Sequence, residues 1–365
     1  MKPQKIYAEV LDDNARAQFD SVMAQDYVVQ GALMADAHLG YGMPIGGVAA
    51  TEGMIVPSWV GYDIGCGMCA CPTTFNVSGV MQYSKQIFDA IYDRVPVGFN
   101  KRDKILPSLL DSRDLSLRAQ LAFLSRGGFS DLGTLGSGNH FIEIGYDTDE
   151  TVWIIIHSGS RGVGHGVAGV YMGAAQEFSD DPAGHHPLPV NSALGKDYIN
   201  DMNWMLAFAL ENRMGILDST VVAIQTKIVG GSLRSKLINR NHNHAEEKDG
   251  LWIHRKGATH AEAGMMGVIP GNMRDGSFIV RGLGNPDSLC SSSHGAGRVL
   301  GRNQAKKTLS MDAFKQTMTG VQAKVCEGTL DESPEAYKNI FDVMQLQGDL
   351  VQRIHHIKPI INIKG

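Results

Sequence analysis

The sequence predicts an α+β fold, a compact domain in which mixed β-sheets are surrounded by helices. Its short strand patterns and scattered helix patterns do not alternate as strand–helix units, which argues against a doubly wound parallel sheet. We expect residues 1–365 to form one domain, although this length also allows two. The 43 glycines are gathered in patches rather than in one linker, so several backbone-built loops are expected to converge on a single site.

Composition narrows the class of protein. A hydrophobic content of 43% and a charged content of 19% are ordinary for a globular chain, and a net charge of −5 argues against a broadly basic nucleic-acid-binding surface. Any polyanion must therefore meet a local basic patch. The start of the chain lacks a secretory apolar core and no long apolar run follows, so we expect a cytoplasmic protein without membrane association. The five cysteines do not suggest a disulfide framework.

Hydrophobic periodicity predicts four helices in the first two thirds of the chain, at residues 15–27, 82–94, 112–126 and 196–215. The helix at 196–215 has a broad apolar face, and its closing residues Asn212 and Arg213 could face the site. The apolar run 152–156 predicts a strand that delivers His157 at its end.

The later segments carry weaker signals. The polar segment 178–189, with His185 and His186, is interpreted as an exposed loop. A helix with Pro334 in its first turn is expected to run to about residue 353, and residues 358–365 are expected to form a short strand whose end frays.

The stretch Cys290-Ser-Ser-Ser-His294-Gly-Ala-Gly-Arg298-Val-Leu-Gly-Arg302 is the candidate anion site. If a helix runs through it, the two arginines share one face with His294 at its start. Glycines allow close backbone approach to a phosphate, guanidiniums grip its oxygens, and a histidine beside it can act as acid, base or nucleophile. A glycine-rich turn with a surface histidine is the alternative for this stretch alone.

Side chains suited to a divalent metal are spread over half of the sequence. They are a carboxylate, a thiol and three imidazoles, namely Asp63, Cys66, His140, His157 and His242. Ligand softness alone favours zinc, with manganese, iron or cobalt as alternatives. His244 is either another ligand or a neighbour, and Asp36 with His38 reads equally as a capped turn or as two groups on one strand face.

Taken together, these motifs resemble the RtcB-type RNA-splicing ligases. The resemblance runs from about residue 30 to the C-terminus in the family's order. The matching segments are Pro44-Ile-Gly-Gly-Val-Ala, Asp63-Ile-Gly-Cys66-Gly, Gly136-Ser-Gly-Asn139-His140-Phe-Ile-Glu143, His157-Ser-Gly-Ser-Arg161-Gly, His242-Asn243, His294-Gly-Ala-Gly-Arg298 with Arg302, Pro334-Glu335-Ala-Tyr337-Lys338 and Lys364-Gly365.

The resemblance implies a compact RtcB-like catalytic domain with its site in a central cleft. It further implies an enzyme that uses GTP and two Mn²⁺ ions to join RNA ends bearing a 3′-phosphate or 2′,3′-cyclic phosphate to 5′-hydroxyl ends, in RNA repair or tRNA splicing. The reaction passes through a histidine–GMP adduct and an RNA 3′-guanylyl anhydride. The native RNA and the need for an activating protein partner stay open.

Residue roles follow from the same resemblance. Cys66 bridges the two ions held by the five metal ligands, and His294 takes GMP. The nucleotide contacts are Asn139 at the phosphates, Glu143 and Lys364 at guanine, Tyr337 near the base, and Ser277, Gly295, Ala296 and Gly297. The RNA terminal phosphate is bound by Arg161, Arg298 and Arg302.

Two features depart from the family pattern. The chain is short for such a ligase, and the turn at 271–278 differs from the serine-containing small-residue turn that the resemblance leads us to expect. A divergent ligase with a narrower RNA substrate is one reading. The alternative is a metal-dependent phosphoesterase that acts on RNA cyclic phosphate ends without ligation, and a non-catalytic RNA-end or metal-binding protein is a third reading.

Overall fold

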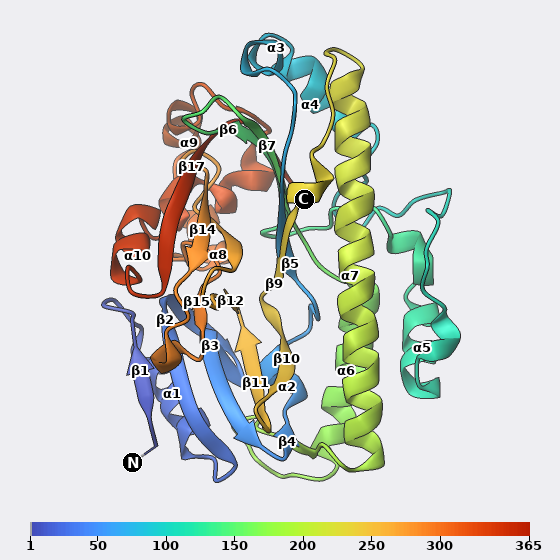
Figure 1. The fold of residues 1–365 in the computed structure, drawn as a ribbon, viewed down its shortest axis with the longest axis vertical. Helices are drawn as coiled ribbons and strands as arrows, with labels where there is room; N and C mark the ends of the chain where they lie inside the picture. The colour runs from blue at the N-terminus through green and yellow to red at the C-terminus, as the bar shows by residue number, and fades with distance from the viewer. Residues whose placement is uncertain (1) are drawn as a thin grey trace.

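A large antiparallel sheet forms one half of the molecule in the computed structural model, which describes residues 2–365 (Figure 1). Its central strands β6 and β7 are flanked by β17 on one side and β5 on the other. In spatial order the strands are β13 (Met266–Pro270), β14 (Ser277–Gly282), β17 (Val351–Lys364), β6 (Phe141–Tyr146), β7 (Val152–Ser158), β5 (Gly67–Pro72) and β9 (Ile238–Asn241), with the short β16 (Gln322–Ala323) parallel to β17.

A second, five-stranded sheet forms the other half. Its order is β1 (Gln4–Ile6), β2 (Val28–Tyr41), β3 (Met43–Glu52), β11 (Leu251–Lys256) and β10 (Asn243–Lys248). Two short strand pairs complete the β-structure, β12 (Ala258–His260) with β15 (Ser291–Ser293) and β4 (Met54–Ile55) with β8 (Leu188–Pro189). The chain passes from β9 in the large sheet to β10 in the second sheet, so His242 lies at the junction of the two sheets.

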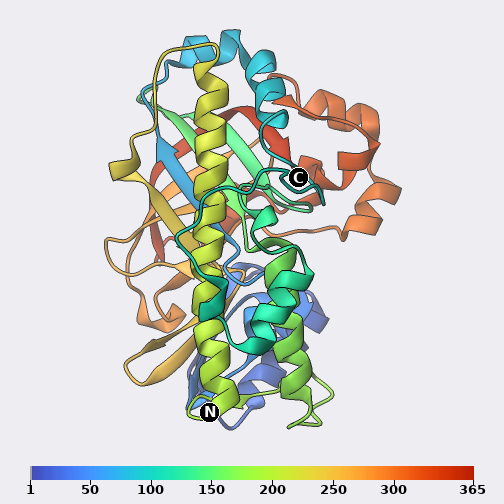
Figure 2. The same cartoon turned by 90° about the vertical axis from the view of Figure 1, so that its right-hand side faces the viewer.

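Helices cover the sheets, and α7 runs along nearly the whole long axis of the molecule (Figures 1 and 2). The helices are α1 (Asp13–Ala24), α2 (Pro57–Val60), α3 (Val77–Gln82), α4 (Ser84–Tyr92), α5 (Leu117–Ser125), α6 (Arg161–Gln176), α7 (Ala193–Gln225), α8 (Arg302–Thr308), α9 (Met311–Thr317) and α10 (Ile340–Leu346). This mixture of mainly antiparallel sheets and peripheral helices confirms the predicted α+β class. Within residues 2–365, none of the helices combines the length and the apolar composition that crossing a bilayer requires.

Periodicity located the long elements well. The four predicted helices correspond to α1, α4, α5 and α7, and the predicted strand at 152–156 corresponds to β7. Helix α7 extends beyond its expected end to Gln225, and β17 begins well before the expected terminal strand.

Two helix predictions differ from the structure, each because of a contact with a distant segment. No helix runs from His294 to Arg302, because Gly297 adopts a φ of +75° and passes so close to the Asp36 carbonyl that a Cβ would lie 2.3 Å from its oxygen. The helix expected from Pro334 to about residue 353 is interrupted, because a 3-10 turn at Pro334–Ala336 is followed by extended Tyr337, which pairs with Arg298. Between residues 334 and 350, only α10 (Ile340–Leu346) is α-helical, and β17 begins at Val351.

The segment at 178–189 also differs from the prediction of an exposed loop, since His185 and His186 are buried. The indole Nε1 of Trp59 donates to His185 Nδ1 at 3.1 Å, and the other ring nitrogen of His185 lies 2.8 Å from the Ser21 hydroxyl. The histidine therefore forms part of the core, and its polar atoms are satisfied there.

A fully buried arginine on α7 ties the segments around the sheet junction together. The Arg213 guanidinium donates to the carbonyls of Gly65 and Ser158, each at 2.9 Å. It also donates to the side-chain oxygens of Asn239 at 2.8 Å and Asn241 at 2.7 Å. One side chain thus fixes the approach to β5, the end of β7 and the whole of β9.

We predict that Arg213→Lys lowers the free energy of unfolding by about 3 kcal/mol, because an ammonium cannot reach four separated acceptors and each orphaned buried acceptor costs about 1–3 kcal/mol. Urea denaturation of the metal-free protein measures this. Arg16→Lys, at an exposed i,i+4 pair with Asp20, is the control and should change stability by less than about 0.5 kcal/mol. Equal effects of the two changes would contradict the role given to Arg213.

Candidate functional site

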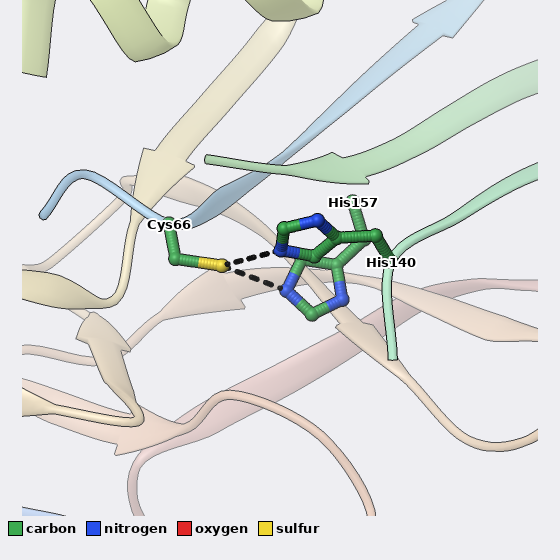
Figure 3. Close-up of side chains that lie close together, drawn as sticks. All are labelled: Cys66, His140 and His157. Atoms are coloured by element: carbon green, nitrogen blue, oxygen red, sulfur yellow. Dashed lines mark hydrogen bonds between the residues drawn. The ribbon is translucent and has the colours of Figure 1, made fainter. Parts of the chain in front are cut away.

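Five side chains from four separate segments meet at the junction of the two sheets. Asp63 and Cys66 lie in the turn that leads into β5, and His140 immediately precedes β6. His157 lies near the end of β7, and His242 lies between β9 and β10. Figure 3 shows the thiol of Cys66 facing the rings of His140 and His157.

The donor atoms of this group are close enough to share metal ions. The Cys66 Sγ lies 3.3 Å from Nε2 of both His140 and His157, and the Nε2 atoms of His157 and His242 are 3.2 Å apart. Asp63 Oδ2 lies 3.1 Å from His140 Nε2. Neighbouring ligands of a divalent ion with bonds of about 2.0–2.3 Å lie roughly 3–3.7 Å apart, so the group fits such an ion.

Burial sets the protonation of these donors. It lowers the pKa of both His157 and His242 well below the usual value, with neighbouring histidines adding to the effect, so both rings are neutral near pH 7 and can offer lone pairs. Burial and the nearby Asp63 carboxylate raise the pKa of the Cys66 thiol. Metal binding at this thiol must therefore release a proton.

His294 lies beside this group, with its ring centroid 4.7 Å from that of His242. Its Nδ1 lies 2.7 Å from Oδ2 of the fully buried Asp36, a close contact that is not aligned as a hydrogen bond. The same carboxylate oxygen accepts from the backbone N–H of Gly295 at 3.3 Å. Asp36 therefore holds the segment that carries His294 and favours a ring whose other nitrogen is free to react.

A cavity of about 290 Å³ opens in front of His294. It brings together residues from distant parts of the chain, from His38 on β2 and Ile45 on β3 to Lys364 at the end of β17. Its walls include His157, Asn139, Phe141, Gly271, His294, Gly295, Ala296, Gly297, Arg298, Arg302, Tyr337 and Lys364. Lys364 is only 8% exposed, so the expectation of a fraying C-terminal end is wrong.

The cationic side chains of this cavity converge on one buried carboxylate, Glu332. Its Oε1 accepts from Arg302 at 2.6 Å and lies 3.3 Å from Arg298 Nη1. Its Oε2 accepts from the Tyr337 hydroxyl at 2.6 Å and from Lys364 at 2.7 Å. Burial alone would raise the pKa of Glu332, but the charges of Lys364 and Arg302 outweigh it and hold that pKa at about 2.

Glu143 and Ser277 lie behind the cavity rather than among its lining residues. Glu143 pairs with Asn362 on the β6–β17 ladder, two positions along from the pair of Phe141 with Lys364. Glu143 Oε1, Ser277 Oγ and Asn362 Oδ1 are buried without a hydrogen-bond partner, and burial raises the pKa of Glu143 to about 8. These orphaned polar atoms fit a ligand with hydrogen-bond donors that reaches past Lys364.

A second cavity, of about 550 Å³, lies on the other side of the metal-ligand group. Arg161, Lys101 and Arg126 line it together with His140, and Asn139 lines both cavities. The structure thus separates the three arginines that were expected at one phosphate, with Arg161 here and the other two in the first cavity. Arg161 has a left-handed backbone, with φ +63°, and its guanidinium occupies space that a side chain at Gly136 would fill.

Sequence reasoning found most of these positions but not all of their partners. Asp36 gave an equivocal signal, and Glu332 gave none beyond its place before Pro334. The positions of the metal-ligand candidates could be read from the sequence because cysteine, histidine and aspartate side chains suited to a divalent ion stand in turns and at the ends of predicted strands. A carboxylate that binds cations from two other segments has no local signature.

The comparisons with known proteins agree with this arrangement. The family described as tRNA-splicing ligase RtcB matches residues 18–123 and 119–365. The chain is 36% identical to the RNA-splicing ligase RtcB of Escherichia coli strain K12 over 97% of this chain and 95% of that protein. It is 31% identical to the tRNA-splicing ligase RtcB of Aeropyrum pernix over 91% of this chain and 87% of that protein.

We predict that Gly159→Ala weakens Mn²⁺ binding at least tenfold without unfolding the protein. The added Cβ would lie 2.3 and 2.5 Å from the two carboxylate oxygens of Asp63 and would push this flexible side chain off the metal-ligand group. Calorimetric titration with Mn²⁺ measures the affinity.

The matched control is Gly169→Ala in α6, where a Cβ meets no atom within 4 Å. This change should leave metal affinity unaltered and stabilise the helix by about 0.5–1 kcal/mol. Wild-type affinity in Gly159→Ala would show that Asp63 is not needed at the metal.

We predict that Glu332→Gln makes the free energy of unfolding depend less steeply on pH in the acid range. The pKa of Glu332 rises from about 2 in the folded protein to 4.5 when unfolded, so its contribution is present above pH 4.5 and is lost as the pH falls towards 2. At pH 7 the variant should be less stable by roughly 2–3 kcal/mol. Thermal unfolding from pH 2 to 7 tests this, with exposed Asp20→Asn as control, and parallel curves for wild type and Glu332→Gln would refute it.

Proposed function

Because the chain belongs to the family of the tRNA-splicing ligase RtcB, and is therefore an RNA ligase, we propose that it joins a 3′-phosphate or 2′,3′-cyclic phosphate RNA end to a 5′-hydroxyl end with GTP and Mn²⁺. The observation that carries the proposal is the position of His294, which lies at the wall of a closed-in cavity and beside the metal-ligand candidate His242. A nucleophile next to a cation site is the arrangement that nucleotidyl transfer requires.

In the first step, His294 attacks the α-phosphate of GTP. A nitrogen–phosphorus bond forms, the bond to the β-phosphate breaks, and pyrophosphate leaves. Asp36 orients the imidazole and stabilises the positive charge that develops on it. Asp63, Cys66, His140, His157 and His242 would hold Mn²⁺, which would supply charge neutralisation at the reacting phosphates.

The nucleotide occupies the cavity of about 290 Å³ in this proposal. Gly295, Ala296 and Gly297 let the backbone approach the phosphates, and Asn139 contacts them from the opposite wall. Tyr337 and Lys364 flank the base, and Glu143 with Ser277 supplies the buried acceptors behind them. Because burial raises the pKa of Glu143 to about 8, guanine binding there is coupled to loss of a proton.

In the later steps, an oxygen of the RNA 3′-phosphate attacks the phosphorus of the histidine adduct and restores His294. A 2′,3′-cyclic end is first hydrolysed to the 3′-phosphate. The 5′-hydroxyl of the second RNA then attacks the activated 3′-phosphate, and GMP leaves. Arg161 binds RNA phosphate from the second cavity. Arg298 and Arg302 bind RNA phosphate from the nucleotide cavity once their contacts with Glu332 rearrange.

The test is incubation of the purified protein with α-labelled GTP and Mn²⁺, followed by denaturing electrophoresis. We expect label on the wild type and on His355→Ala, a change on β17 outside both cavities, and none on His294→Ala. We expect no detectable label on His294→Ala because alanine leaves no nucleophile at that position to attack the α-phosphate.

Label on folded His294→Ala would show that the GMP adduct forms on another residue. Absence of label from folded, metal-loaded wild type would overturn the guanylylation step. In that case hydrolysis of a 2′,3′-cyclic phosphate RNA end without joining would support the phosphoesterase alternative.

A further inference from the structure

A second group of potential metal ligands lies just beyond His242, outside both cavities. It consists of His244 and Glu246 on β10, His260 at the end of β12, and Glu262 immediately after it. One ligand atom from each of His244, Glu246 and His260 lies within 4.8 Å of the others. None of the four is required by the ligation chemistry described above.

The acceptor atoms are concentrated around one ring nitrogen. His260 Nδ1 lies 3.1 and 3.3 Å from the two carboxylate oxygens of Glu262, and 3.6 Å from Glu246 Oε1. The His244 and His260 rings are stacked, with centroids 4.8 Å apart and planes inclined by 23°. Two imidazoles and two carboxylates within this space are the donor set of a zinc site or of a similar divalent ion.

The buried ring of His244 is incompletely satisfied by the protein, so one of its nitrogens is available to a ligand. Its Nδ1 has no hydrogen-bond partner, and the residue is only 3% exposed. Its Nε2 has a single long contact, 3.4 Å from Nη1 of Arg255. A buried polar atom without a partner costs about 1–3 kcal/mol, so an ion bound by this ring would relieve a real deficit.

Cations already approach the two carboxylates of this group. The buried Arg255 guanidinium contacts Glu246 at 2.5 Å and approaches Glu262 at 3.7 Å. Lys248, whose side chain is 40% exposed, also reaches Glu262 at 3.7 Å. The charge of Glu262 partly offsets the burial that lowers the pKa of Arg240. The arrangement of the donor atoms, and not an excess of negative charge, therefore favours a metal ion here.

Another ligand-like group, of Asp147, Asp149 and His355, does not share these properties. Asp147 Oδ1 accepts from the backbone N–H groups of Asp149 and Thr151, each at 3.0 Å, and its Oδ2 accepts from the Trp153 indole at 2.8 Å. Its lone pairs are already used within the protein, so it serves as a comparison for the first group.

We propose that His244, Glu246, His260 and Glu262 bind one zinc-like divalent ion at a site separate from the Cys66 group. The ion ties β10 to β12, whose partner β15 leads directly into His294, and β10 begins directly after His242. The site is thus a brace behind the reactive segment rather than part of its chemistry. It does not depend on the function proposed above.

The test is to count metal equivalents in the full-length protein by titration with Co²⁺ as a spectroscopic substitute for zinc. Cobalt bound to Cys66 gives a thiolate charge-transfer band, whereas the proposed site has no sulfur and gives only weak ligand-field bands. We expect both signals in the wild type. Cys66→Ala should lose the charge-transfer band and retain sulfur-free binding, to which Asp63, His140, His157 and His242 can also contribute, so the proposed site is identified by the variants of its own ligands.

The decisive variants are Glu262→Gln, which keeps the shape of a partly exposed side chain, and His260→Ala. Each should lower the affinity of the sulfur-free equivalent at least tenfold and leave the charge-transfer band in place. His355→Ala, in the comparison group, should change neither signal. Circular dichroism of each variant verifies that it is folded.

Retention of the sulfur-free equivalent in folded Glu262→Gln and His260→Ala would overturn the proposal, as would its loss in His355→Ala. Absence of any sulfur-free equivalent in Cys66→Ala would also overturn it. Because the readout is metal binding, these outcomes are independent of GTP labelling at His294.

Discussion

The site depends on one buried guanidinium. Arg213 projects from α7 to the backbone before Cys66, to the end of β7 beyond His157, and to β9 immediately before His242. Its four acceptors come from three segments that contribute most of the metal-ligand candidates, so the spacing of those side chains is fixed by the fold itself. Such preorganisation reduces the conformational entropy that metal binding must overcome. The neighbouring Asn212 extends the same constraint by donating to the carbonyls of Thr134 and Gly159.

A second constraint is electrostatic. Arg298, Arg302 and Lys364 would repel one another in a half-closed cavity, and the buried Glu332 carboxylate holds them together. Glu332 therefore orders these side chains and makes the cavity less positive than three cations alone would make it. An incoming phosphate can replace Glu332 as the partner of these side chains, because guanidinium groups bind carboxylates and phosphates with the same geometry. An acidic chain with a net charge of −5 can therefore still bind a phosphate, because the cations that would contact it are gathered at one place.

The two cavities explain why so many glycines are needed. Gly159 allows the carboxylate of Asp63 to approach the backbone, Gly136 leaves space for the Arg161 guanidinium, and Gly297 passes the Asp36 carbonyl. Each is a close contact that a Cβ would prevent, and they lie in different patches of the sequence. The glycine patches thus mark the places where loops from the two sheets meet around one set of polar side chains, with the 290 Å³ and 550 Å³ cavities on either side.

The sequence by itself determined the α+β class, the long helices and the positions of the metal-ligand candidates, because periodicity and unusual side chains are local signals. Only the tertiary structure decided how the segments after His294 and Pro334 run, since strand pairing and the contact at Asp36 override local helix signals. It also revealed the partners of Glu332 and the group around His260. Those arrangements join positions far apart in the chain, and no local pattern records which distant charges will share a buried space.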